Sequence, residues 1–132
     1  MDEKLNYLLD TCILIDYLRG EQSVYDLLVN NAKIKLSMST ITMMELIIGA
    51  FNKREVNYIQ KAFKNIDIIY IDKDISKLAE NLVREYSKSH NLQIDDALIA
   101  ATSIKKNIEL ITYNVSDFKF IPNIGLYQYS LA

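Results

Sequence analysis

Two kinds of apolar pattern alternate along the chain. Short continuous apolar runs predict buried strands at 5–9, 34–38, 66–71 and 110–112, and the tail 126–129 is a further candidate edge strand. Between them, apolar residues recur at spacings of three and four, which predicts helices over 11–18, 24–28, 44–51, 56–63, 75–86 and 94–104. Ser39, Thr40 and Thr42 supply hydroxyl caps for the third helix, and Asp74 is the expected cap of the fifth.

This alternation of strands and helices predicts an α/β fold. Strands joined through helices form a mostly parallel sheet covered on both faces, so we expect a three-layer α/β/α arrangement with four or five central strands. The stretch 94–104 is apolar around most of its circumference, which indicates a helix buried on more than one side. With 132 residues, the chain is expected to form one domain, 1–132.

Composition narrows the class of protein further. Half of the residues are hydrophobic and a quarter are charged, as in soluble globular proteins. The formal net charge of −2 excludes a globally basic surface, so nucleic acid would have to be held by local cations or by a bound metal. The N-terminus begins Asp2-Glu3-Lys4, unlike a signal peptide, and acidic residues interrupt each apolar stretch before membrane-spanning length, so no membrane association is expected.

The single cysteine and the single histidine both have structural interpretations. Cys12 has no partner for an internal disulfide, which fits the reducing cytoplasm, and we interpret it as a small apolar filler in the first helix. His90 is far from it in sequence and is expected to close the long helix that precedes it.

Acidic residues recur where the predicted strands end. Asp10 follows the first strand, Glu45 lies in the helix after the second, and Asp117 comes shortly after the last. Asp95 and Asp96 open the buried helix. Ligands of parallel sheets bind outside the carboxyl ends of the strands, so these acids are candidates for a shared site.

Three or four carboxylates from separate segments suit a hard divalent cation. Mg²⁺ and Mn²⁺ prefer carboxylate and water oxygens, and such an ion polarises a phosphoryl oxygen and activates water. No set of histidines or cysteines is available for zinc. Each acid also has a structural interpretation that stays open at this point. Asp10 and Asp96 suit helix N-termini, Thr42 and Glu45 fit a capping box, and Asp117 suits an Asx-turn.

Four motifs in this order resemble the PIN-domain ribonucleases, in particular the VapC toxins of toxin–antitoxin pairs. The resemblance covers nearly the whole chain. Its motifs are Leu8-Leu9-Asp10-Thr11-Cys12 with Ile15-Asp16; Ser39 to Leu46 with Gly49; Ile94-Asp95-Asp96 followed by Ala97 to Thr102; and Leu110 to Asn114 with Asp117-Phe118.

The resemblance implies a PIN-like fold and roles for individual residues. It assigns catalytic, metal-binding carboxylates to Asp10, Glu45, Asp96 and Asp117. Asp96 is preferred to its neighbour Asp95 because it directly precedes the Ala-Leu-Ile-Ala-Ala run. Thr112 and Asn114 would support the site, Thr11 would orient the turn at Asp10, and Asp16 would be structural.

The activity implied is that of a cytoplasmic, Mg²⁺-dependent endoribonuclease in which Mn²⁺ can substitute. Its partners would be an RNA substrate, a small antitoxin and a second copy of the chain. The alternative is a PIN-like module that binds RNA or protein without catalysis. An aspartyl phosphatase is disfavoured because Thr11 and Cys12, not a second acid, follow Asp10, and a receiver domain because its acid pair comes early in the chain. Candidate RNA contacts are Arg19, Lys53, Arg54, Lys105 and Lys106.

Overall fold

Four parallel strands form the centre of the molecule. The computed structural model describes residues 5–29 and 34–127, and its strands are β1 (Leu5–Leu9), β2 (Ile34–Ser39), β3 (Asp67–Ile69) and β4 (Glu109–Ile111). They are ordered β3-β2-β1-β4, and every pair is parallel. All four carboxyl ends therefore meet at one edge of the sheet. Parallel neighbours need crossover connections, which the helices provide.

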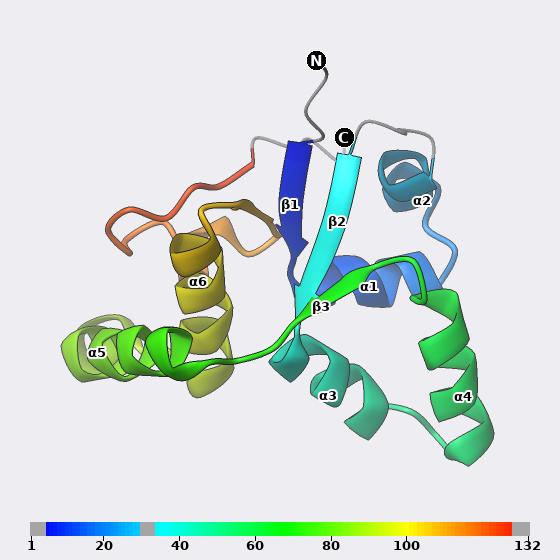
Figure 1. The fold of residues 1–132 in the computed structure, drawn as a ribbon, viewed down its shortest axis with the longest axis horizontal. Coiled ribbons are helices and arrows are strands. Elements are labelled where there is room, and N and C mark those ends of the chain that lie inside the picture. The colour runs from blue at the N-terminus through cyan, green and yellow to red at the C-terminus, as the bar shows by residue number, and fades with distance from the viewer. Residues whose placement is uncertain (1–4, 30–33, 128–132) are drawn as a thin grey trace.

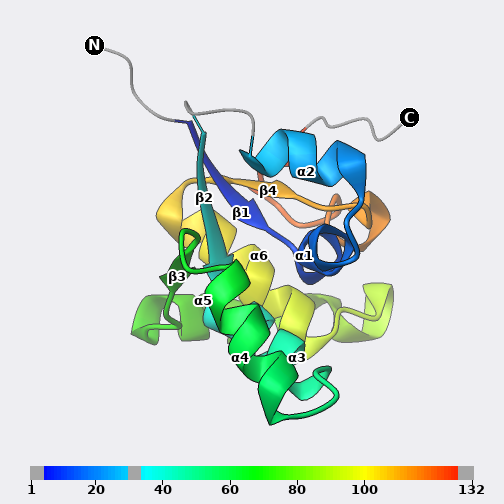
Figure 2. The same cartoon turned by 90° about the vertical axis from the view of Figure 1, so that its right-hand side faces the viewer.

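Helices cover both faces of this sheet (Figure 1). One face carries α5 (Lys73–His90) and α6 (Ile94–Lys106), and the other carries α1 (Thr11–Leu18), α2 (Gln22–Val29) and α4 (Lys53–Ala62). The short α3 (Thr40–Ile48) extends β2 past the carboxyl edge, so it lies beyond the end of β1 (Figures 1 and 2). The predicted three-layer α/β/α fold is confirmed.

The core is split into two apolar clusters by the alternation of side chains along each strand. Leu8 and Leu110 pack with α5 and α6, whereas Tyr7, Leu9 and Ile111 pack with the helices of the opposite face. Successive strand residues point to opposite faces, so a continuous apolar run is what a strand buried on both sides requires. The helix α6 is buried on several sides, as its sequence predicts, since it contacts α5, α3, β2 and β4.

Some predicted boundaries were wrong. The cap of α5 is Asp72, whose carboxylate accepts the Ile75 N–H at 2.9 Å, not Asp74. β3 is half as long as the run 66–71, and β4 begins one residue before the predicted strand. In the tail, Leu126 makes a single parallel bridge to Leu110, and positions 128 and 129 of the expected edge strand lie outside the described residues.

Asparagine closes the two long helices. Asn91 and Asn107 follow α5 and α6 in the left-handed conformation, with φ values of 54° and 55°. Asparagine tolerates this conformation better than most residues, which explains how a chain with three glycines ends its helices. His90 closes α5, as expected, and stacks on Phe120 with ring centroids 4.3 Å apart. None of the described helices is long and apolar enough to cross a membrane.

Candidate active site

Asp10 occupies the junction between β1 and α1. It is the N-cap of α1, and its Oδ1 accepts the Thr11 N–H at 2.8 Å. Unlike a surface cap it is only 5% exposed, because it lies between β2 and β4 at the carboxyl edge of the sheet. Burial raises the pKa of Asp10, although hydrogen bonds from Thr112 and Thr11 oppose the shift. The capping interpretation is therefore correct but incomplete.

The segment after β4 supports Asp10 from the other side. The Thr112 hydroxyl donates to Asp10 Oδ2 at 2.7 Å, and the Asn114 N–H donates to Thr112 Oγ1 at 2.9 Å. Thr112 is 9% exposed, so its hydroxyl is fixed by these two partners rather than by solvent. The structure thus brings both supporting residues to Asp10, and Asn114 contributes through its backbone.

Glu45 approaches the same edge from α3. Thr11 Oγ1 donates to Glu45 Oε1 at 2.8 Å and lies 3.2 Å from Thr42 Oγ1. The capping-box interpretation of Thr42 and Glu45 is wrong, because the N-cap of α3 is Ser39, whose side chain accepts the Ile41 N–H. Burial is the main cause that raises the pKa of Glu45, and a hydrogen bond with Asp95 and its charge add to the rise.

Asp95 and Asp96 lie in the first turn of α6, whose N-cap, Gln93, makes no side-chain capping bond. Asp95 Oδ1 accepts the Asp96 N–H at 2.9 Å. The pKa of Asp96 is raised to about 7, first by burial and then by the charges of the nearby acids, which are Asp95, Asp10, Asp117 and Glu45. Four segments far apart in sequence therefore place carboxylates close enough to repel one another.

Asp117 reaches this cluster from the 3₁₀ turn Val115–Asp117 and is the most exposed member. Asp95, which the sequence left as an uncertain neighbour, faces Glu45 and so belongs to the cluster electrostatically. Cys12 also borders the site, since its thiol donates to Asp10 Oδ2 at 3.6 Å. Burial raises the pKa of Cys12 to about 11, so it remains a thiol and not a thiolate at neutral pH.

The donors gathered here are carboxylate and hydroxyl oxygens, which suit a hard divalent cation and not zinc. Across the described ranges 5–29 and 34–127, no three acidic, histidine or cysteine side chains are grouped tightly enough to enclose a metal ion as they stand. Mutual repulsion favours such separation, and a cation between the carboxylates would remove it.

A groove between α1, α3 and α4 leads to Glu45. Its inner part, a cavity of about 380 Å³, is lined by Glu45, Leu46, Ile15 and Arg19, among others. A second cavity of about 500 Å³ continues it along α4, past Arg54 and Tyr58. We call these two cavities together the α1–α4 groove. Of the candidate RNA contacts, Arg19 and Arg54 lie in it. Arg19 pairs with Asp16 at 3.9 Å, and Lys106 pairs with Asp72 at 3.5 Å.

Residues 7–121 match the family model described as the PIN domain. The chain belongs to the PIN-domain family. This PIN domain is 34% identical to ribonuclease VapC19 of Mycobacterium tuberculosis over 122 residues, which are 89% of this chain and 95% of that protein. It is 32% identical to ribonuclease VapC1 of Methanocaldococcus jannaschii, over 96% of this chain and 89% of the relative. The family predicted from the four sequence motifs is confirmed.

A solved structure described as a toxin–antitoxin complex from Klebsiella pneumoniae has a similar fold and similar sequence. The TM-score is 0.76 at 32% identity, over 95% of this PIN domain and 99% of that chain. VapBC2 from Rickettsia felis, bound to a DNA fragment from its promoter, gives a TM-score of 0.80 at 27% identity, over 96% and 100% of the two chains.

Proposed function

We propose that this PIN domain is a divalent-metal-dependent endoribonuclease, the toxin of a VapBC-type pair, acting in the cytoplasm. The observation that carries the proposal is the convergence of acids from four segments at the carboxyl edge of the sheet, around Asp96. Independent helix caps need not converge in this way. The ribonuclease relatives support the same chemistry.

Asp10, Glu45 and Asp96 would hold the ion, with Asp117 completing or supporting the set. Mg²⁺, or Mn²⁺ in its place, would polarise the phosphodiester and activate a water molecule for in-line attack. Thr112 and the Thr11 N–H fix the Asp10 carboxylate, one at each oxygen, and the Thr11 hydroxyl fixes Glu45. These hydrogen bonds fix two of the carboxylates before the substrate arrives, which limits the rearrangement that metal binding would require.

The test is cleavage of a 5′-labelled synthetic RNA by the purified chain. We expect cleavage with Mg²⁺ or Mn²⁺, none with EDTA, and products bearing a 5′-phosphate and a 3′-hydroxyl. Asp96→Asn should abolish cleavage while Asp95→Asn keeps most of it. The reverse result would move the ligand assignment to Asp95. A wild-type protein that binds the RNA without cutting it under any metal would identify an inactive binding module instead.

For the antitoxin, we propose that a helix or extended tail lies in the α1–α4 groove. The groove combines apolar residues such as Leu18 and Ile59 with Glu45 at its inner end, so a segment bound there would lie against the acidic site. The solved toxin–antitoxin complexes with this fold support such a partner. Without the antitoxin, Arg19 and Arg54 are the groove cations best placed to contact RNA.

We also propose a homodimer, formed through the outer face of α3. Ile48 is 84% exposed, and Met44, which is 44% exposed, lies one turn before it on the same side of α3. Phe51, which is 89% exposed, follows shortly after the end of the helix. Exposed apolar side chains grouped in this way are typical of interfaces. Ile48→Glu should turn a dimer into a monomer at micromolar concentration by light scattering, whereas Tyr70→Glu, at a separate exposed apolar position, should not. A monomeric wild type would reject the dimer.

A further inference from the structure

Glu45 is the one ligand candidate held by a chain of side-chain hydroxyls. Its Oε1 lies 2.8 Å from Thr11 Oγ1, and Thr11 Oγ1 lies 3.2 Å from Thr42 Oγ1. Thr42 is on α3, three residues before Glu45, so the two side chains lie on the same side of the helix. Thr11 reaches them from α1, across the interface between the two helices.

The Thr11 hydroxyl is the donor in both of these hydrogen bonds. An ionised carboxylate only accepts, and a hydroxyl has one proton to give. Thr11 therefore shares its proton between Glu45 Oε1 and Thr42 Oγ1, and these two acceptors together fix the position of the Thr11 hydroxyl. Thr42 is 0% exposed, and Thr11 supplies the partner that so deeply buried a hydroxyl requires.

Glu45 needs such a restraint because the neighbouring charges oppose its position. Burial is the largest cause that raises the pKa of Glu45, and the charges of Asp95 and Asp10 add to the rise, so like charges lie close to this carboxylate. The helix α3 ends at the exposed Ile48, about one turn beyond Glu45. Repulsion between like charges would swing a side chain on the rim of the site outward. A hydroxyl fixed from behind by a buried partner opposes this motion at little entropic cost, because threonine is stiff at χ1.

We infer that Thr42 is a positioning residue, which acts through the Thr11 hydroxyl to hold the Glu45 carboxylate within the acidic cluster. From its position in the sequence, the simplest prediction for Thr42 is a helix cap, but Ser39 already caps α3. The consequence for metal binding rests on the proposed function, whereas the placement of Glu45 does not.

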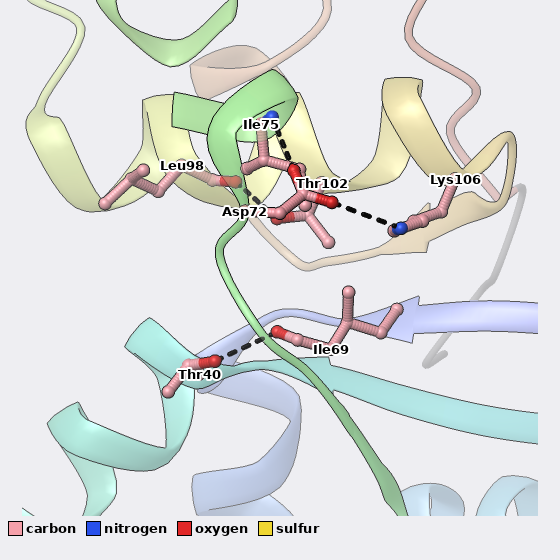
Figure 3. Close-up of polar contacts among 7 residues, drawn as sticks. All are labelled: Thr40, Ile69, Asp72, Ile75, Leu98, Thr102 and Lys106. Carbon is pink, nitrogen blue, oxygen red and sulfur yellow. Dashed lines mark hydrogen bonds and ion pairs between the residues drawn. The ribbon is translucent and has the colours of Figure 1, made fainter. Parts of the chain in front are cut away.

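The experiment compares Thr42→Val, Thr42→Ser and a matched control, Thr102→Val, each in the full chain. Thr102 is also 0% exposed, but its hydroxyl donates to the Leu98 carbonyl inside α6 at 2.7 Å (Figure 3). Removal of an outer-shell partner weakens metal binding about 10- to 100-fold. We expect a loss of about tenfold or more in Mn²⁺ affinity by calorimetry for Thr42→Val, near wild-type affinity for Thr42→Ser, and none of this loss for Thr102→Val.

Crystal structures of the wild type and Thr42→Val provide a readout that needs neither metal nor activity. Loss of the Thr11–Glu45 hydrogen bond in the variant, with Glu45 turned outward, supports the inference. An unchanged position of Glu45 in Thr42→Val overturns the inference. Wild-type Mn²⁺ affinity in Thr42→Val, or an equal loss of Mn²⁺ affinity in Thr42→Val and Thr102→Val, also overturns it. If the wild type binds no Mn²⁺ and cuts no RNA, the proposed function fails, and the position of Glu45 in the two crystal structures still decides the role of Thr42.

Discussion

Two aspartates cap helices that follow strands of the same sheet, and their environments are opposite. Asp10 caps α1 after β1, and Asp72 caps α5 after β3. Each carboxylate accepts a backbone N–H, at 2.8 Å from Thr11 and 2.9 Å from Ile75. Asp72 is exposed and pairs with Lys106 at 3.5 Å (Figure 3), whereas Asp10 is buried with other acids around it.

The pKa values of the two groups move in opposite directions as a result. The Ile75 N–H is the main cause that lowers the pKa of Asp72, and Lys106 adds to the effect. For Asp10 burial dominates and raises the pKa, despite a similar hydrogen bond. β1 is a central strand and β3 an edge strand, so only the first cap is enclosed. A local capping motif therefore does not distinguish a structural acid from a functional one.

The largest expected difference between the two caps is catalytic. Asp10→Asn should lower RNA cleavage by more than about a hundredfold, because it removes a proposed direct metal ligand. Removal of a direct ligand should reduce activity more than removal of an outer-shell partner does. Asp72→Asn keeps a good cap far from the acids and should leave kcat/KM within about twofold of the wild type. Initial rates on one labelled RNA give both values. Equal losses in the two variants would show that Asp10 acts as a cap only.

Metal-dependent stabilisation should separate the caps next. At a hundredfold excess over its dissociation constant, Mn²⁺ should stabilise the wild type by about 2.7 kcal/mol, which corresponds to a rise in Tm of about 10 °C. Asp72→Asn should keep this gain and Asp10→Asn should lose most of it, while being at least as stable as the wild type in EDTA. Thermal melts with and without Mn²⁺ measure this, and a wild type that does not respond would reject the metal site.

The pH dependence of stability should have opposite signs in the two regions. The pKa of Asp96 is raised to about 7 in the folded protein, from about 3.8 in the unfolded chain. Its contribution to folding stability is therefore complete below pH 3.8 and is lost as pH rises through 7. In EDTA, the wild-type Tm should therefore fall by several degrees between pH 5 and 8, relative to that of Asp96→Asn. Asp72 has a lowered pKa in the folded protein, so it stabilises the fold at pH values above its unfolded-state pKa. This stabilisation is lost as pH falls through the lowered pKa. Parallel Tm profiles of the wild type and Asp96→Asn would mean that the acids do not interact.

The smallest expected effect concerns the exposed cap. Asp72→Ala should lower Tm by a few degrees, because the Ile75 N–H loses its acceptor, while RNA cleavage by the folded protein is unchanged. Asp74→Ala is the matched control, since Asp74 is the neighbouring acid that does not cap the helix. If Asp74→Ala were the more destabilising of the two, the N-terminus of α5 would be placed wrongly.

The sequence by itself determined the order of elements and the family. The apolar runs of β1 and β2 and the apolar stripe of α5 are local patterns. A strand buried on both faces gives a continuous apolar run, and a helix buried on one side gives apolar residues at spacings of three and four. The motifs around Asp10, Glu45, Asp96 and Asp117 were sufficient to identify a PIN domain, which the match over residues 7–121 confirmed. Boundaries were less accurate at the short strands β3 and β4, where few residues carry the pattern.

Only the tertiary structure decided what each acid contacts. Asp74 and Asp72 both suit a helix start, and the backbone geometry alone selects Asp72. Thr42 and Glu45 have capping-box spacing, but the partner of both is Thr11, 31 and 34 residues away. The environment of Asp10 likewise depends on Thr112, which is 102 residues distant. Burial and like-charge repulsion arise from segments that meet only in the fold, so no local pattern records them, and they are what distinguish Asp10 from Asp72.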